Sequence, residues 1–290
     1  MAAMYKKEFQ SYFRNLTGYI FVFFILLVLG LYTSIYCFSR GTSHFEYVYY
    51  SCNFLFLIAV PILTMRAIAE ERRQKTDQLL YSLPVSTAQI VLGKYFAMVT
   101  VFAIPIGVSA LFPLVLHMYD PSGYISYTTV YSVILAFFLL GCAMIAIGLF
   151  MSSLTENQII AAVLSFAAML VCFLMGSLKQ YLPTGAGASS IGFAILILAL
   201  ALIVLAVTRN KTAAWLLFVV LEIPVIVITI VKPDLMQNAM PAVFSALSVF
   251  DRFYSFLDGV FDITALVYFI SIAVVFNFFT VQSMEKRRWS

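Results

Sequence analysis

Apolar runs of about 20 residues recur along this 290-residue chain and constrain its fold more than any other feature. A bilayer core about 30 Å thick requires about that length per crossing helix, whereas a soluble domain has no use for several such runs. Hydrophobic residues make up 63% of the chain and charged residues 10%, which is outside the range of soluble domains. The sequence therefore predicts an all-α, polytopic membrane protein.

The apolar runs and the polar breaks between them predict about eight transmembrane helices in a single transmembrane domain, residues 1–290. Its expected parts are 1–18 (an amphipathic interfacial helix), 19–69 (spans one and two), 70–89 (a cytoplasmic segment), 90–178 (spans three to five), 179–231 (spans six and seven), 232–262 (outer interfacial helices) and 263–290 (span eight and a basic tail). The sequence leaves open whether residues 185–231 cross the membrane fully or form a re-entrant pair.

The N-terminal segment predicts a helix that lies in the plane of the lipid headgroups. Aromatic residues of this segment recur at helical spacing, and Lys6, Lys7, Glu8 and Arg14 fall on the other side. Basic residues next to an aromatic face favour contact with anionic lipid. Membrane lipid is therefore an expected partner.

The distribution of basic residues predicts the orientation. Eight spans place both termini on one side of the membrane, together with most of the 17 Lys and Arg residues. The other side holds Arg40, Lys179, Lys232 and Arg252. Because basic residues are retained on the cytoplasmic side, we expect both termini and the loop after span two to be cytoplasmic.

We find no motif that indicates catalysis, a cofactor, a metal site or nucleic-acid binding. The sequence has no HExxH, no GxSxG and no GxxxxGK[ST] phosphate-binding loop. Its four cysteines have no CxxC spacing, and the sequence does not establish whether Cys37 and Cys52 form a disulfide. We therefore expect no enzymatic activity in this chain itself.

Glu222 is the ionisable residue expected at membrane depth, near the middle of span seven. Such residues are costly in the bilayer and usually functional, so Glu222 is a candidate for a translocation path or a proton carrier. The alternative is a carboxyl that is protonated or hydrogen-bonded to a neighbouring helix, near the carbonyl freed by Pro224. An ion-coupled secondary carrier that uses Glu222 is one competing function, and a non-transporting membrane anchor or assembly factor is another.

The charged stretch 64–95 indicates a partner-binding segment. Span two continues as a helix through residues 70–73, and Leu79 and Leu80 then form an apolar strip beside polar residues. Pro84 ends this helix. A solvated loop needs no such leucines, so the pattern favours docking of another protein.

Three helix starts are marked by capping residues. The stretch Thr155-Glu156-Asn157-Gln158 is interpreted as a capping box that opens span five. Ser86 with Gln89 forms a capping box that begins span three, and Asp262 is expected to cap span eight.

The stretch TMRAIAEERRQKTDQLLYSLPVSTAQIVLGK resembles the loop after the second span in permease subunits of ABC transporters of the type 2 (ABC-2) export family, particularly the gliding-motility and copper-site-maturation branch. Three further stretches resemble the same branch: KKEFQSYFRNLTGYIF, IGLFMSSLTENQIIAA and FDRFYSFLDGVFDITALVYFISIAVVFNFFTVQSMEKRRW. Together they cover well over half of the chain, in order.

The resemblance implies a permease whose loop after span two carries a coupling helix that sits in a groove of a separate ATP-binding-cassette ATPase subunit, present in two copies per complex. It also implies a second permease copy or a sister permease, an extracytoplasmic auxiliary protein as a further candidate partner, export as the direction, and a bacterial plasma membrane. Carried over by position, the ATPase-contact residues are Glu70, Glu71, Arg72, Arg73, Thr76, Leu79, Leu80 and Pro84.

The chain departs from the family pattern in two respects. Lys75 stands where the family usually has glycine, and Gln78 stands where it often has glutamate, which indicates a matched ATPase partner. Many relatives have six spans, so spans six and seven are expected to be an inserted hairpin.

Overall fold

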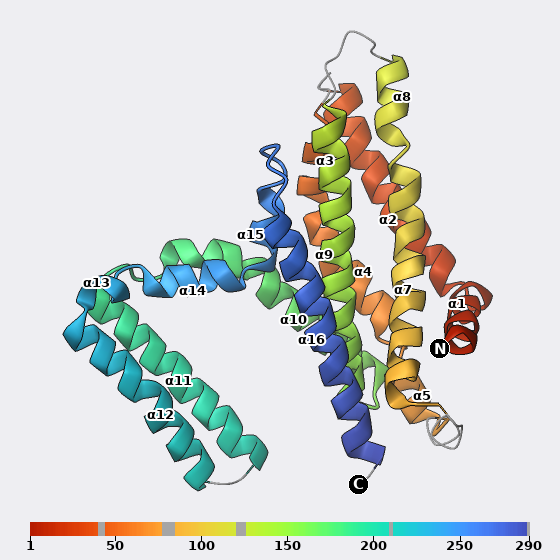
Figure 1. The fold of residues 1–290 in the computed structure, drawn as a ribbon. Helices are drawn as coiled ribbons and strands as arrows, with labels where there is room; N and C mark the ends of the chain where they lie inside the picture. Colours follow the sequence, from red (N-terminus) through yellow and green to blue (C-terminus); the bar gives the residue numbers. More distant parts are fainter. Residues whose placement is uncertain (40–43, 77–84, 120–125, 209–210, 289–290) are drawn as a thin grey trace. The chain divides into compact units, whose positions relative to one another are not determined.

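The computed structural model describes residues 1–39, 44–76, 85–119, 126–208 and 211–288, and the elements in these ranges are helical (Figure 1). The α-helices are α1 (Ala2–Arg14), α2 (Thr17–Thr33), α3 (Glu46–Ser51), α4 (Leu55–Thr64), α5 (Ala69–Arg73), α7 (Thr87–Ser109), α8 (Phe112–Tyr119), α9 (Tyr127–Ser153), α10 (Gln158–Leu178), α11 (Ala186–Thr208), α12 (Lys211–Val231), α13 (Pro233–Met236), α14 (Ala239–Leu247), α15 (Val249–Tyr254) and α16 (Ile263–Arg288). The chain forms two compact units, which are treated separately: unit 1 is Met1–Cys172 with Val249–Ser290, and unit 2 is Phe173–Ser248.

Within the described ranges, six helical segments are long and apolar enough to cross a membrane. They are Thr17–Ser39, Glu46–Arg73, Thr87–Met118, Tyr127–Ser153, Gln158–Tyr181 and Ile263–Arg287. Two shorter apolar helices, Ala186–Leu202 and Trp215–Val231, correspond to predicted spans six and seven. The prediction of a multi-span, all-α membrane protein is confirmed, and full crossing by the two shorter helices stays a prediction.

Helix α9 forms the centre of unit 1. In its most apolar stretch 78% of the residues are buried, compared with 28% in α2 and in α16. Phe137 on α9 packs its ring against Phe56 at 4.7 Å and against Tyr49 at 4.9 Å between centroids. Phe102 of α7 and Phe253 of α15 also lie near this ring, at 6.4 and 5.9 Å between centroids, so Phe137 joins several helices around α9 at the core of the bundle.

Glycines on α9 allow its neighbours to approach closely. A Cβ atom at Gly141 would lie 2.2 Å from the ring of Phe102, and one at Gly148 would lie 2.6 Å from Thr64 Oγ1. Small residues permit this kind of contact between membrane helices. The end of α4 is therefore held directly against α9.

Two of the three predicted caps are confirmed, those at Ser86 and Asp262. At the start of α10 the cap is Asn157 and not Thr155, because Asn157 Oδ1 accepts a hydrogen bond from the Ile159 amide at 2.9 Å. Ser86 Oγ accepts a hydrogen bond from the Gln89 amide at 3.3 Å at the start of α7. Asp262 Oδ1 accepts one from the Thr264 amide at 2.8 Å at the start of α16. These caps supply partners for amides that have none within their own helix.

Unit 2 contains the antiparallel hairpin of α11 and α12, followed by the short helices α13 and α14 (Figure 1). Ser190 on α11 and Thr229 on α12 share a hydrogen bond of 2.6 Å between their hydroxyls. Met240 on α14 packs against Gly192, where a Cβ atom would lie 2.8 Å from the methionine methyl group. Most large side chains of α11 and α12 are apolar and exposed, as expected of helices that meet lipid or other membrane segments.

Candidate functional site

The segment at the end of the second candidate span, residues 65–76, is here called the elbow. It contains α5 and the turn that joins α4 to α5, and it precedes α7 in the chain. Ser152 Oγ on α9 accepts hydrogen bonds from the Ile68 and Ala69 amides, each at 3.3 Å, and donates to the Met65 carbonyl at 3.4 Å. Because the first amides of α5 have no partner within that short helix, one serine of α9 holds the turn between α4 and α5.

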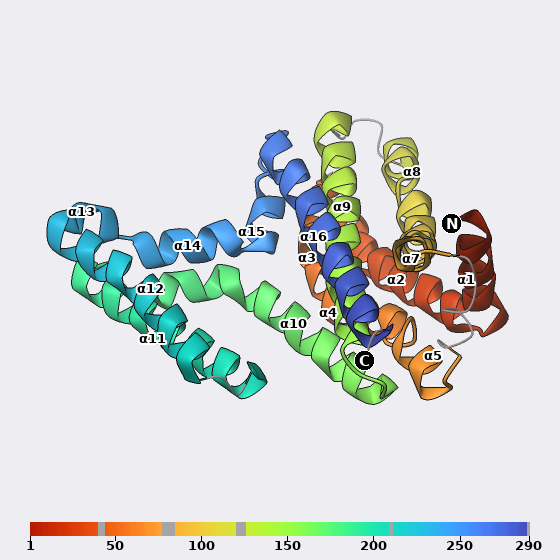
Figure 2. The same ribbon diagram turned by 60° about the horizontal axis from the view of Figure 1, so that its bottom comes forward.

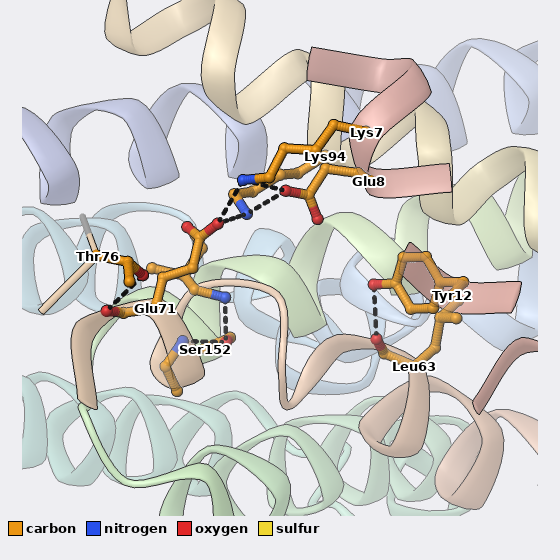
Figure 3. A network of polar contacts seen from close by, with 10 residues as sticks. Lys7, Glu8, Tyr12, Leu63, Glu71, Thr76, Lys94 and Ser152 are labelled. Atoms are coloured by element: carbon orange, nitrogen blue, oxygen red, sulfur yellow. Dashed lines mark hydrogen bonds and ion pairs between the residues drawn. The ribbon is translucent and has the colours of Figure 1, made fainter. Parts of the chain in front are cut away.

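A buried ion cluster ties the elbow to two further helices (Figure 3). Lys94 Nζ on α7 lies 2.8 Å from Glu71 Oε1 of the elbow and 3.0 Å from Glu8 Oε1 of α1, and its side chain is 1% exposed. Lys7 Nζ lies 3.7 Å from both carboxylates, so two cations balance two anions. An ammonium group buried without partners costs several kcal/mol, so these carboxylates are required for Lys94 to remain charged there.

Helix α1 packs against α7 and α2 through its buried face (Figure 2). The Tyr12 hydroxyl donates to the Leu63 carbonyl at 3.1 Å, beside the start of the elbow (Figure 3). Burial raises the pKa of Tyr12 above its ordinary value, and the negative charges of Glu8 and Glu71 raise it further. The phenol therefore stays neutral and keeps donating.

The basic residues of the elbow take different positions. Arg72 is buried, and its Nη1 donates to the Ser153 carbonyl at the end of α9. Arg66 pairs with Glu70 at 3.3 Å and donates to Thr17 Oγ1 at 3.1 Å. Unlike these two, Arg73 is exposed.

Helix α5 ends in a left-handed residue. Lys75 has φ of 55°, a conformation that costs residues other than glycine about 1–2 kcal/mol. The Thr76 amide donates to the Glu71 carbonyl at 3.0 Å, and the Lys75 amide donates to the Arg72 carbonyl at 3.1 Å. This pair of bonds is the Schellman helix end, whose left-handed position is usually glycine. The backbone thus explains why glycine suits the position at which the chain carries Lys75.

Three of the eight predicted contact residues, Leu79, Leu80 and Pro84, lie outside the described residues. Two others, Glu71 and Arg72, contact side chains and carbonyls of this chain. Three remain more open: Glu70 is partly exposed, Arg73 is exposed, and Thr76 is partly buried with its hydroxyl donating to the Glu71 carbonyl at 3.3 Å.

Glu222 lies in α12 of unit 2, apart from the elbow residues in sequence and in unit assignment. Its Oε2 atom is buried, and no hydrogen-bond partner for it occurs among the described residues. Cys37 and Cys52 are both buried free thiols.

Sequence reasoning missed the partners of the elbow. Glu8 was assigned to the polar face of an interfacial helix. Ser152 indicated only a small-residue packing face of span four, and Ser153 carried no recognised signal. Lys94 did offer one, because it lies seven residues after the start of α7 between apolar neighbours. A cation at such a position needs a counter-ion, although the sequence does not say which acid supplies it.

The comparisons with known proteins identify a family. A family model described as "ABC-2 family transporter protein" matches residues 38–187, which is more than half of the chain. The matched region contains the elbow, Lys94 and Ser152. No curated protein and no solved structure matches the chain.

Proposed function

Because the chain belongs to the ABC-2 family of transporter proteins, we propose that it is the membrane-spanning permease subunit of an ATP-driven exporter. Permeases of this family have no ATPase domain and generally work with separate ATP-binding subunits. In the proposed complex, this chain and a second permease, either another copy or a sister subunit, assemble with two ATP-binding-cassette subunits. An extracytoplasmic auxiliary protein is a further proposed partner, in keeping with the gliding-motility and copper-site-maturation branch.

The proposed location is a bacterial plasma membrane, with the elbow and both termini in the cytoplasm. The excess of basic residues on that side supports this orientation. The elbow, the start of α1 and the end of α16 also lie in the same half of unit 1 (Figure 1). An ATP-binding subunit would meet the elbow from the cytoplasm.

The observation that carries the proposal is the fixation of the elbow by the Lys94 cluster and by Ser152. A partner that pushes on a free loop would bend the loop. The elbow is instead bonded to α1 and α7 through Glu71, and to α9 through Ser152 and Arg72. A displacement imposed on it would therefore move these helices together, as a switch between inward- and outward-facing arrangements requires.

The eight candidate residues take two roles in this proposal. Glu71 and Arg72 position the elbow, since both bond to other helices of the chain. The surface offered to the ATP-binding subunit comprises Glu70, Arg73 and Thr76, continued by Leu79, Leu80 and Pro84. Charged residues of both signs that lie close in sequence to apolar ones suit a specific protein interface.

Co-purification with the ATP-binding subunit tests the proposal. Two variants, the single Arg73→Glu and the double Leu79→Asp/Leu80→Asp, are expected to abolish recovery of the ATPase on the tagged permease. Each places repulsive or unpaired charge in the interface. Arg73 is the suitable arginine for charge reversal, since reversal at Arg72 would also break a buried bond. Membrane insertion, measured by the yield of the permease, is expected to be unchanged.

Lys232→Glu serves as the matched control, because it reverses an exposed charge far from the elbow in sequence. It is expected to leave ATPase recovery at the wild-type level. Normal recovery with all the elbow variants would refute the proposed contact surface.

Glu222 supports one alternative function, an ion-coupled secondary carrier, because its buried Oε2 has no hydrogen-bond partner in the described part of the chain. Transport in proteoliposomes that contain no ATPase subunit, and that stops with Glu222→Gln, would favour this alternative. Transport that requires ATP and the ATPase subunit, with Glu222→Gln still active, would exclude it.

A further inference from the structure

The last carbonyl of α9 joins two segments that are far apart in sequence. Ser153 O accepts hydrogen bonds from Arg72 Nη1 of the elbow and from Ser283 Oγ of α16, the latter at 3.2 Å. Carbonyls in the last turn of a helix have no partner within the helix, and the negative end of the helix dipole favours a cation there. Arg72 and Ser153 are both buried, so water does not compete for this carbonyl.

The end of α16 is held at the same place by a second contact. Arg287 forms an ion pair with Glu156 in the link between α9 and α10. Both side chains are about half exposed, so this pair contributes little by itself. Met284, one residue after Ser283, is 1% exposed and packs the same turn into unit 1. The part-buried hydrogen bond of Ser283 and the buried side chain of Met284 therefore place the end of α16 relative to α9.

Helix α16 also forms one wall of an apolar groove of about 480 Å³ whose other walls are α7 and α9. Tyr95, Cys142 and Phe278 line it, one from each helix. Tyr95 directly follows Lys94, so one wall of the groove is bonded to the elbow through the ion cluster. The other wall, α16, reaches the elbow through Ser153.

We infer that Arg72 and Ser283 are positioning residues that link the elbow to α16 through the shared Ser153 carbonyl. A shift of the elbow displaces Arg72, which is one of the two donors to the Ser153 carbonyl, and thereby shifts α16, which carries the other donor. Two walls of the groove, α7 and α16, therefore respond to the same movement of the elbow. The inference rests on the proposed function only for the source of that movement. The link itself is a property of the chain alone.

Amide hydrogen exchange on the purified chain, without any ATPase subunit, tests the link in both directions. Coupling between two sites is reciprocal. Ser283→Ala is therefore expected to speed exchange of the elbow amides 68–76 about fivefold, the ratio that corresponds to one net hydrogen bond. Arg72→Lys is expected to speed exchange in residues 280–287 by a similar factor, since a lysine keeps the charge but not the guanidinium geometry.

Two variants separate a positioning role from a local one. Ser283→Thr keeps the hydroxyl and is expected to restore wild-type exchange in the elbow. Ser271→Ala is the matched control, because the Ser271 hydroxyl donates to the Val267 carbonyl of its own helix at 2.7 Å. It is expected to leave the elbow unchanged.

Elbow exchange in Ser283→Ala that equals that of Ser271→Ala would overturn the inference. Normal exchange of residues 280–287 in Arg72→Lys would overturn it as well. Because no partner is present, either result is distinct from a failure of ATPase co-purification, which would refute the proposed function.

Discussion

Lys94 Nζ and Glu71 Oε1 lie 2.8 Å apart in a site where the lysine side chain is 1% exposed. This ion pair joins the third candidate span to the elbow, and Glu8 extends it to α1 at 3.0 Å. Three segments that are separate in sequence therefore share one buried charge. Any movement of the elbow that preserves this pair moves α7 and α1 with it.

Removing the shared cation should destabilise the protein strongly. Lys94→Met leaves Glu8 and Glu71 close together without their buried partner, and breaking a buried pair in this way costs about 3–5 kcal/mol. We expect a clear fall in the thermal unfolding temperature of the detergent-solubilised protein. Lys94→Met combined with Glu71→Gln should be more stable than Lys94→Met alone, because one unpaired anion is removed.

Lys6→Met is the control for this series, since Lys6 lies on the exposed face of α1. It should change the free energy of unfolding by no more than an ordinary surface substitution does, about 0.5 kcal/mol. Equal stability of Lys94→Met and Lys6→Met would contradict the role assigned to the cluster.

Tyr12 should make stability depend on alkaline pH. Burial and the nearby carboxylates raise the pKa of Tyr12 in the folded protein, whereas the unfolded chain ionises it near about 10. Above that pH the folded state binds more protons than the unfolded state. The stabilisation that Tyr12 contributes is therefore complete below about pH 10 and is lost as the pH rises further.

Unfolding temperatures of wild type and Tyr12→Phe between about pH 8 and 11 measure this effect. At pH 8 the variant should be less stable by about 1 kcal/mol, the value of the hydrogen bond to Leu63. Above about pH 10 the difference in stability between wild type and Tyr12→Phe should become smaller. A gap that stays constant or widens would show that Tyr12 does not contribute in this way.

Lys75→Gly should stabilise the elbow by about 1 kcal/mol, because glycine adopts the left-handed conformation without steric cost. Slower amide exchange in residues 69–76 is the measurement. Lys75→Ala keeps a Cβ atom and should give no such gain, so a similar effect from both substitutions would point to charge and not to backbone conformation.

Gly148→Ala should destabilise unit 1 by about 1–3 kcal/mol. The added methyl group would lie 2.6 Å from Thr64 Oγ1 and 2.9 Å from Val60 Cγ1, so the helices would have to separate. Gly30→Ala is the matched control, since a Cβ atom there has no atom within 4 Å. Its unfolding temperature should stay at or above the wild-type value, and equal losses from the two substitutions would contradict this packing.

Much of the fold was accessible from the sequence because its signals are local. The length and composition of the apolar runs predicted the six candidate spans, and side chains next to the helix starts predicted the caps at Ser86 and Asp262. The stretch around the elbow also carried the resemblance to ABC-2 permeases, which the family match confirms, while the finer branch stays a prediction.

The candidate site was accessible only in part. The sequence indicated that residues 70–73 matter as a group, but it did not separate Arg72 from Arg73. The structure does so, since Arg72 donates to the Ser153 carbonyl and Arg73 is exposed. The two adjacent arginines differ because only one of them faces the end of α9.

Hydropathy, helix length and capping depend on neighbours along the chain, so the class of the protein, the positions of its long apolar helices and its family could all be predicted from the amino-acid sequence. The sequence did not predict that Lys94 pairs with Glu8, 86 positions away, or that Ser153 joins Arg72 to Ser283. Such pairs depend on which helix faces meet when the bundle packs. A buried charge requires a partner, but only packing determines which partner lies within reach.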